Sequence, residues 1–188
     1  MGGGRVRIVA GTARGRTLRA PKNDKIRPTA DRVRETIFNL LGQTLPGGEV
    51  LDLFAGTGAL ALEALSRGAT RAVLVDNGRE AIELCRANAS ALGFQDRVRV
   101  LALPVDRALK KLRSEGAIFD LIFADPPYAA LVATHLLEKI VENQLLASGG
   151  VACIEHDKRE RLADSIGRLV QDDARRFGDT VVSFYRTA

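Results

Sequence analysis

The stretch VLDLFAGTGALALEALSRG, residues 50–68, indicates the fold of the whole chain. Its first five residues, 50–54, are apolar apart from one aspartate, which is typical of a buried strand. Two glycines follow, and an alanine- and leucine-rich helical pattern then runs over 59–68. A glycine turn between a strand and a helix lets a ligand approach the backbone, and the helix amino terminus offers free N–H groups. We therefore predict a strand, a ligand-binding turn and a helix.

Strands and helices alternate after this stretch. We predict strands at 71–76, 97–103, 119–125 and 149–156, separated by helices at 79–93, 106–116 and 131–146. We then expect a helix near 158–168 and two strands at 169–177 and 180–186, with Gly178-Asp179 as their turn. Apolar strands spaced by helices predict a parallel sheet covered on both faces. The predicted fold is thus α/β and Rossmann-like, with a seven-stranded, mostly parallel sheet and an antiparallel C-terminal hairpin.

Basic residues are concentrated before residue 35. Residues 1–34 contain ten Lys and Arg against two Asp, whereas the whole chain has a net charge of +5. A basic arm on a near-neutral body is expected for a polyanionic partner, and arginine suits bidentate phosphate contacts. The stretch RVRIVAGTARGRTLRAP, residues 5–21, is broken by glycines and predicts a small β-hairpin, after which a helix is expected up to Leu41.

Composition excludes several classes of protein. No apolar run reaches the length of about 18 residues that a membrane span needs, and the start lacks the apolar core of a signal peptide. Cys85 and Cys153 lie in apolar segments without metal-ligand spacing. We expect a cytoplasmic protein with two reduced core thiols, no metal and no membrane partner.

The residues around the glycine turn favour a cationic ligand. Gly56, Gly58 and Ala61 fit the G-x-G-x-x-A spacing of dinucleotide-binding turns, which alone is a weak signal. The Asp52 carboxylate would repel a pyrophosphate, but it would attract the positively charged ammonium and sulfonium groups of S-adenosylmethionine (AdoMet). Asp76, at the end of the next strand, can bond a ribose diol. We predict AdoMet, with a nicotinamide or flavin cofactor and a purely structural turn as alternatives.

A second motif, FDLIFADPPY at residues 119–128, ends a core strand in an acid, two prolines and an aromatic ring. This strand should lie beside 50–54, because ligand sites form where the strand order reverses. Asp125 and the carbonyl of Pro126 can each accept one N–H of an amino group, and Tyr128 can stack on a planar ring. We predict a clamp for an amine on an aromatic base. The alternative is a strand that stops at the prolines, with the ring packed on the core.

Such an amine is a poor nucleophile, because its lone pair is spread into the ring. Two acceptors can pull it toward sp³ geometry and aim the lone pair at a methyl sulfonium. The predicted step is in-line methyl transfer without a covalent enzyme intermediate, so positioning and electrostatics carry the acceleration.

The motifs together resemble a known family. D-P-P-Y with D-L-F-A-G-T-G-A-L resembles amino-methyltransferases that act on adenine N6 or guanine N2. R-I-V-A-G-x-x-R-G-R-x-L and R-P-T-x-D-R-V-R-E-T-I-F-N resemble the RsmD family of bacterial methyltransferases, and the resemblance covers nearly the whole chain. It implies methylation of a guanine N2 in 16S rRNA, free or in an assembling small subunit, with S-adenosylhomocysteine as product. It also implies a flipped-out target base. We expect a monomer.

The resemblance assigns roles to three groups of residues. The target base would be held by Asp125, Pro126, Pro127 and Tyr128. The cofactor would be bound by Asp52, Phe54, Ala55, Gly56, Thr57, Gly58, Asp76, Asn77, Pro104 and Val105. RNA would be contacted by Arg5, Arg7, Arg14, Arg16, Arg19, Lys22, Arg27, Thr29, Arg32 and Arg34. The chain would comprise a basic RNA-binding hairpin extension over 1–28 and a methyltransferase domain over 29–188.

Pro104 departs from the family pattern, in which the third strand often ends in an acid that takes the adenine amino group. Asp106 lies two residues further and is a second candidate for that contact. The backbone N–H of Val105 and apolar walls are the remaining means of holding the adenine.

Three other functions remain open from the residues. The main alternative is an adenine-N6 methyltransferase acting on RNA or DNA, although DNA enzymes of this kind usually carry a separate recognition domain. A protein-glutamine methyltransferase tends to have Asn where this chain has Asp125. A non-catalytic RNA-binding module would not need the intact motif residues.

Overall fold

The computed structural model describes residues 6–21, 28–42, 45, 47–127 and 132–187, with the side chains of 28–31 excepted. Eight strands form one sheet in the order β3-β2-β1-β4-β5-β8-β7-β6. The strands are β1 (Glu49–Leu53), β2 (Arg71–Asp76), β3 (Val98–Ala102), β4 (Phe119–Ala124), β5 (Leu146–Asp157), β6 (Ser165–Ile166), β7 (Leu169–Phe177) and β8 (Thr180–Thr187). The helices are α1 (Pro28–Leu41), α2 (Ala59–Ser66), α3 (Arg79–Leu92), the 3₁₀ turn Gln95–Arg97, α4 (Val105–Ser114) and α5 (Val132–Glu142).

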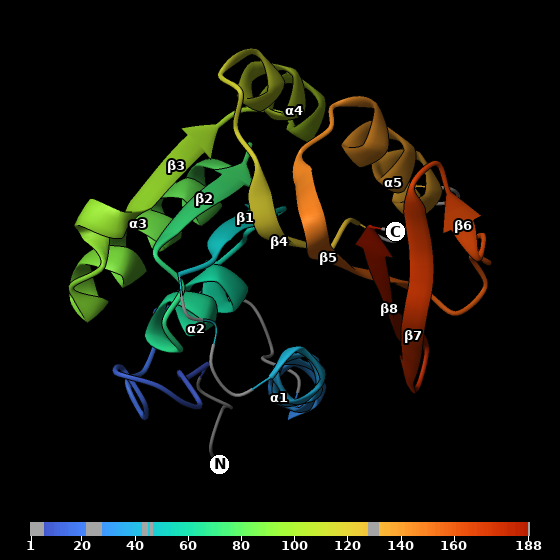
Figure 1. Cartoon of the computed structure of the whole chain (residues 1–188). Helices are drawn as coiled ribbons and strands as arrows, with labels where there is room; N and C mark the ends of the chain where they lie inside the picture. Colours follow the sequence, from blue (N-terminus) through green and yellow to red (C-terminus); the bar gives the residue numbers. More distant parts are fainter. Residues whose placement is uncertain (1–5, 22–27, 43–44, 46, 128–131, 188) are drawn as a thin grey trace.

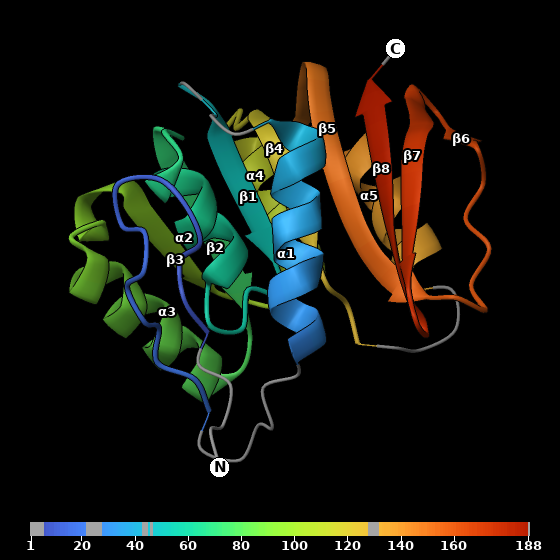
Figure 2. The same ribbon diagram turned by 90° about the horizontal axis from the view of Figure 1, so that it is seen from below.

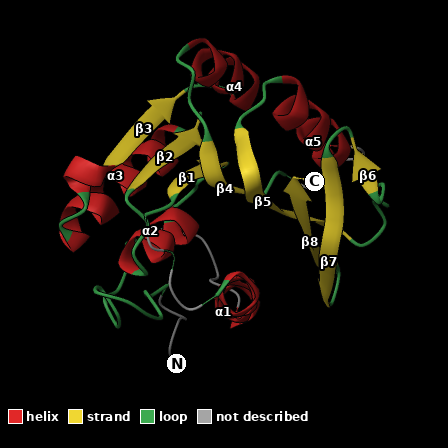
Figure 3. Cartoon of the chain, in the orientation of Figure 1, coloured by secondary structure: helices red, strands yellow, loops and turns green. Residues whose placement is uncertain are grey.

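The sheet is parallel from β3 to β5 and antiparallel from β5 to β6. Helices α4 and α5 cover one face, and α1, α2 and α3 cover the other (Figures 1 and 3). The two faces bury separate hydrophobic clusters, because successive residues of each strand point to opposite sides. Leu51 and Leu53 of β1, for example, pack toward α4 and α5, whereas Val50 packs toward α2. The predicted α/β fold with an antiparallel C-terminal hairpin is confirmed.

Two details of the predicted sheet are wrong. It has eight strands rather than seven, because the expected helix near 158–168 does not form. This segment is tied to its neighbours instead: the Glu160 carboxylate accepts from the backbone N–H of Thr134, and Tyr185 Oη donates to the Ala163 carbonyl. It then ends in β6, a two-residue edge strand. The helix expected at 131–146 likewise ends at Glu142, and β5 begins at Leu146.

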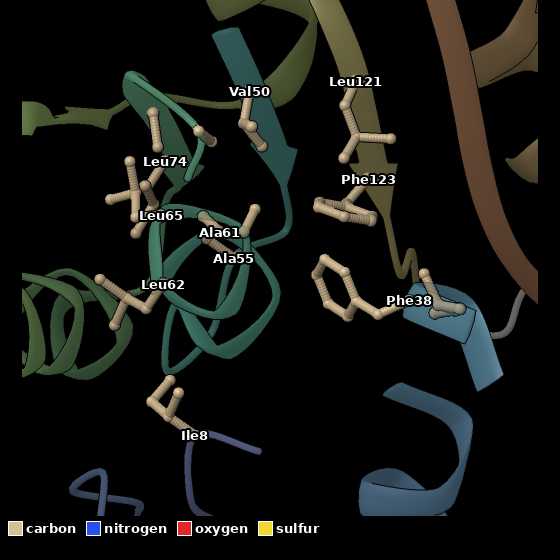
Figure 4. Close-up of a cluster of buried hydrophobic side chains, with 14 of the residues drawn as sticks. Ile8, Phe38, Val50, Ala55, Ala61, Leu62, Leu65, Leu74, Leu121 and Phe123 are labelled. Carbon is tan, nitrogen blue, oxygen red and sulfur yellow. The ribbon is translucent and has the colours of Figure 1, made fainter. Parts of the chain in front are cut away.

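The N-terminal segment, residues 6–21, folds back on itself as the expected hairpin, with a single antiparallel bridge between Arg7 and Thr17. Backbone N–H groups of Ile8, Gly15 and Leu18 donate across the hairpin to the carbonyls of Arg16, Ile8 and Val6 at 2.8–2.9 Å. Apolar side chains of the segment are buried in the same cluster as α2, where Figure 4 shows Ile8 beneath that helix. The hairpin is therefore docked on the helical layer and does not project from the protein as a free arm.

Helix α1 crosses the same face of the sheet beside the N-terminal segment (Figure 2). Its Phe38 ring packs on Phe123 of β4, with a centroid separation of 5.7 Å (Figure 4). The guanidinium of Arg67, which follows α2, lies 4.6 Å from the centroid of the same Phe38 ring. These contacts fix α1 on β4, the strand that carries the second motif. Within the described part of the chain, we find no helix with the length and apolarity to cross a membrane.

Candidate functional site

The predicted site residues gather where the parallel strands end. Leu53, the last residue of β1, pairs with Val75 of β2 on one side and Ala124 of β4 on the other. The residues that follow these strands are therefore close neighbours, and the strand order reverses between β1 and β4. This confirms the prediction that the FDLIFAD strand lies beside the VLDLF strand.

The turn after β1 has the geometry that its glycines allow. Gly56 and Gly58 have φ angles of 54° and 77°, a region that disfavours side chains, and Phe54 also has a positive φ of 61°. A Cβ on Gly58 would lie 2.8 Å from Cδ2 of Leu74. The turn is thus pressed against β2 and leads directly into α2, whose first N–H groups have no intrahelical acceptor.

Asp52 lies inside the protein beneath this turn. It is 3% exposed, and its carboxylate accepts a hydrogen bond of 3.2 Å from the backbone N–H of Ala61 in α2. The pKa of Asp52 is raised to about 8, chiefly by burial, with a smaller contribution from the nearby carboxylates of Asp125 and Asp76, whereas the bond from Ala61 lowers it. An acid in this state favours a cationic ligand, because a positive charge nearby would stabilise the carboxylate.

The Asp76 carboxylate holds the backbone of two neighbouring turns, the one after β1 and the one after β2. One carboxylate oxygen accepts from the backbone N–H of Gly56 at 3.0 Å, and the other accepts from Gly78 at 2.9 Å. Each oxygen keeps a second lone pair, so the carboxylate can still accept from the hydroxyls of a ribose.

A pocket of about 260 Å³ opens directly beside Asp76. It is lined by Phe54, Asp76, Asn77, Leu103, Pro104, Val105 and Asp106. Five of these seven are predicted cofactor residues, and they come from the ends of three different strands. Val105 is the first residue of α4, so its N–H is free for a ligand. A larger cavity of about 320 Å³, which includes Gly48 and Asp120, opens where β1 and β4 begin, at the other ends of these strands. It is lined by none of the predicted residues.

Asp125 stands one strand away from the pocket, after β4. It keeps access to solvent, yet the surrounding protein raises the pKa of its carboxyl to about 7, chiefly by desolvation and secondly through repulsion by Glu155 on β5. Pro126 is buried and Pro127 is exposed. Tyr128, the predicted stacking residue, lies outside the described residues.

The basic residues predicted to contact RNA have two kinds of environment. Arg7, Arg14, Arg16, Arg19 and Arg32 are exposed. Arg34 is buried instead: it donates to the Arg7 carbonyl at 2.8 Å, and its Nε lies 3.9 Å from Glu63. Its guanidinium therefore faces the protein interior. Arg5, Lys22, Arg27 and the side chain of Thr29 lie outside the described residues.

The structure also identifies residues that the sequence patterns did not. One of them is Leu103, which completes the pocket. Asp106, the second candidate for the adenine contact, also lines the pocket, and its carboxylate contacts Lys139 Nζ at 2.5 Å. Behind the glycine turn, Cys85 Sγ donates to the Gly56 carbonyl, and Asn88 bonds the Thr57 carbonyl. For Cys85 and Asn88, the only sequence signal is that a polar residue lies on the apolar face of a helix.

Glu63 shows that signal most clearly. It is the single charged residue of α2 and is fully buried. Its carboxylate accepts from the backbone N–H groups of Val9 and Ala10 at 2.7 and 2.9 Å and pairs with Arg67 at 2.8 Å. The acid in an apolar helix therefore anchors the N-terminal segment.

The two cysteines are buried free thiols. Burial, together with the carboxylates of Asp52 and Asp76, raises the pKa of Cys85 to about 12, so its thiol is not an activated nucleophile. Among the residues described, no group of three or more His, Cys, Asp or Glu is arranged to hold a metal ion.

Comparisons with known proteins agree with this geometry. Residues 6–186 match the family described as Conserved hypothetical protein 95. The chain is 35% identical over 156 residues to Ribosomal RNA small subunit methyltransferase D of Escherichia coli (strain K12), covering 83% of this chain and 77% of that protein.

Two solved structures share the fold. A protein from Escherichia coli described as putative methyltransferase yhhF has a TM-score of 0.86 and 30% identity, with 98% of each chain covered. The Thermus thermophilus 16S rRNA N2 G1207 methyltransferase (RsmC), solved in complex with AdoMet and guanosine, has a TM-score of 0.70 and 24% identity, over 89% of this chain and 45% of that one. The architecture described above is therefore the class I methyltransferase fold.

Proposed function

The chain belongs to the RsmD family, and on that premise we propose that it transfers a methyl group from AdoMet to the exocyclic N2 amine of a guanine in 16S rRNA. One observation carries the proposal: the pocket beside Asp76 and the acceptor Asp125 lie on either side of the glycine turn that follows β1. The strand order reverses next to this turn, between β1 and β4. A methyl donor in the pocket and an amine at Asp125 would thus be neighbours.

The pocket fits AdoMet by its chemistry. The Asp76 carboxylate would bond the ribose hydroxyls, and Leu103, Pro104 and the free N–H of Val105 would hold the adenine. The methionine end would follow the turn at 55–58 above Asp52, where its positive charges meet the buried acid. No phosphate is present in AdoMet to repel Asp52, whereas a dinucleotide would place its pyrophosphate next to this residue.

The Asp125 loop would hold and orient the target amine. The carboxylate of Asp125 and the carbonyl of Pro126 would each accept one N–H, and Tyr128 would stack on the base. The amine lone pair then forms the N–C bond as the C–S bond breaks, and the bonding pair moves to sulfur to leave a neutral thioether. The surplus amine proton passes to Asp125 or to solvent. Catalysis consists of alignment and charge placement.

The arginines of the N-terminal segment would bind the RNA backbone near this site. Arg7, Arg14, Arg16, Arg19 and Arg32 are exposed and form the proposed set, from which the buried Arg34 is left out. The base must leave its stack to reach Asp125. We propose that the protein acts as a monomer in the cytoplasm, on 16S rRNA that is free or within an assembling small subunit.

Methyl transfer is tested with tritiated AdoMet and two substrates from cells that lack this protein: naked 16S rRNA and small ribosomal subunits. We expect the wild-type chain to label at least one of them and the Asp125→Ala variant to label neither, while AdoMet affinity of the variant stays within a few-fold. Label retained by Asp125→Ala at a near-normal rate would contradict the role of Asp125. Label on duplex DNA instead would favour the adenine-N6 alternative.

A further inference from the structure

The side chain of Asn88 joins two segments that are far apart in the sequence. It lies on α3 with 1% of its surface exposed. Its Oδ1 accepts from the backbone N–H of Arg19 at 2.7 Å, while Nδ2 donates to the Arg19 carbonyl at 3.0 Å and to the Thr57 carbonyl at 2.9 Å. The amide orientation follows from these partners, because the reverse orientation would place acceptor against acceptor and donor against donor.

The two segments have different proposed roles. Arg19 belongs to the basic segment that would bind RNA, and Thr57 lies between the two glycines of the turn that would receive AdoMet. One turn earlier on α3, Cys85 Sγ donates to the Gly56 carbonyl at 3.3 Å. Helix α3 therefore supports the glycine turn from behind, and through Asn88 it also bonds both backbone groups of Arg19.

We propose that Asn88 is a positioning residue that couples RNA binding by the N-terminal segment to AdoMet binding by the glycine turn. This inference rests on the proposed function. Because the amide is buried, losing one partner would leave a buried polar group unsatisfied, so the positions of Arg19 and Thr57 depend on each other. RNA that holds Arg19 in place also fixes the amide and the Thr57 carbonyl. AdoMet arriving second then loses less conformational entropy, and the converse follows by reciprocity.

Neighbouring residues provide matched controls. The Ser66 hydroxyl bonds the segment: its Oγ accepts from Ala13 N–H at 2.9 Å and donates to the Ala10 carbonyl at 2.5 Å. Cys85 touches the turn, with no described bond to the segment. Ser66→Ala therefore weakens the docking of the segment, and Cys85→Ala weakens the support of the turn. Asn88→Ala removes the bonds to both.

The experiment measures binding of radiolabelled S-adenosylhomocysteine to the full chain by equilibrium dialysis, with and without saturating 16S rRNA transcript. A second arm replaces the transcript with small subunits from cells lacking the protein. In the wild type we expect RNA to tighten binding by about fivefold or more, in the usual range for coupled sites. The factor should fall to about one in Asn88→Ala and stay within about twofold of wild type in Ser66→Ala and Cys85→Ala.

Two results would overturn the inference: a wild-type coupling factor of one, or an undiminished factor in Asn88→Ala. If Asn88→Ala does not fold, Asn88→Asp replaces it, since Asp keeps an acceptor for Arg19 N–H but presents no donor to the carbonyls of Arg19 and Thr57. Asp should likewise lower the factor to about one, and retained coupling in it overturns the inference. A wild-type chain that binds neither ligand would refute the proposed function itself, whereas binding of both without coupling refutes only the role of Asn88.

Discussion

Replacing Gly11 with alanine should detach the N-terminal segment from α2, and Gly15→Ala is the matched control. The two glycines have nearly equal φ angles, +78° and +80°. A Cβ at position 11 would lie 1.8 Å from the Ser66 carbonyl oxygen, whereas a Cβ at position 15 would meet nothing within 4 Å. Both variants carry the same backbone strain, so their difference isolates the contact with Ser66.

The magnitude follows from what must move. Left-handed strain costs about 1–2 kcal/mol in either variant. In Gly11→Ala the obstacle is backbone, so no side-chain rotation relieves it, and the segment must withdraw from Ser66. Withdrawal breaks the bonds from Thr12 N–H to the Ser66 carbonyl at 2.8 Å and from Ala13 N–H to Ser66 Oγ at 2.9 Å. At roughly 1 kcal/mol per bond, Gly11→Ala should lose about 3–4 kcal/mol of unfolding free energy.

Urea unfolding followed by circular dichroism gives both free energies, and filter binding gives the affinity for 16S rRNA. We expect Gly11→Ala to be at least about 2 kcal/mol less stable than Gly15→Ala, from the two lost bonds, and to bind RNA more weakly, with AdoMet binding reduced far less. Equal stability of the two variants would mean that the close approach to Ser66 is not part of the folded state.

Three further outcomes are expected. Because Asp52 has a pKa raised to about 8 and a cationic ligand would lower it, AdoMet binding should release a proton. AdoMet affinity should therefore rise from pH 6 to 8 and level off above, as measured by calorimetry in buffers of different ionisation enthalpy, and Asp52→Asn should flatten the rise between pH 7 and 8. Asp125 must be ionised to accept the amine, and its pKa is raised to about 7 partly by Glu155. The rate of methyl transfer should thus increase with pH through about 7, and Glu155→Gln should move the midpoint to lower pH; an unmoved midpoint would exclude Asp125 as the titrating group. Replacing Arg14, Arg16 and Arg19 together by Gln should reduce the salt slope of RNA binding by about 2–3, since each lost phosphate contact contributes about 0.7–0.9 to the slope for nucleic acids. The same change at Arg159, Arg175 and Arg176, near the antiparallel edge, should leave the slope unchanged.

The sheet and the ligand-binding edge could be predicted because their signals are local. The period of apolar residues, the glycine turn and the acids at the ends of β1 and β2 lie within short stretches, and the structure places Phe54, Asp76 and Asn77 together around one pocket. The two-residue β6 had no such signal. Its segment is fixed by bonds to α5 and β8, and these partners are far away in the sequence.

The partners of the N-terminal segment are the larger part that could not be predicted. A basic glycine-rich stretch predicts a hairpin but not where it docks: Glu63 binds the backbone at Val9 and Ala10 and holds the segment on α2. The same contact explains Arg34, which reads as one more basic residue of the arm but lies buried near Glu63. A charge count cannot separate such an arginine from those that face solvent.

The central claim is the identity of the methylated base. Small-subunit rRNA from cells lacking this protein is incubated with the purified chain and tritiated AdoMet, digested to nucleosides, and resolved by liquid chromatography and mass spectrometry. We predict that the label co-elutes with N2-methylguanosine. N6-methyladenosine as the sole labelled nucleoside would contradict it.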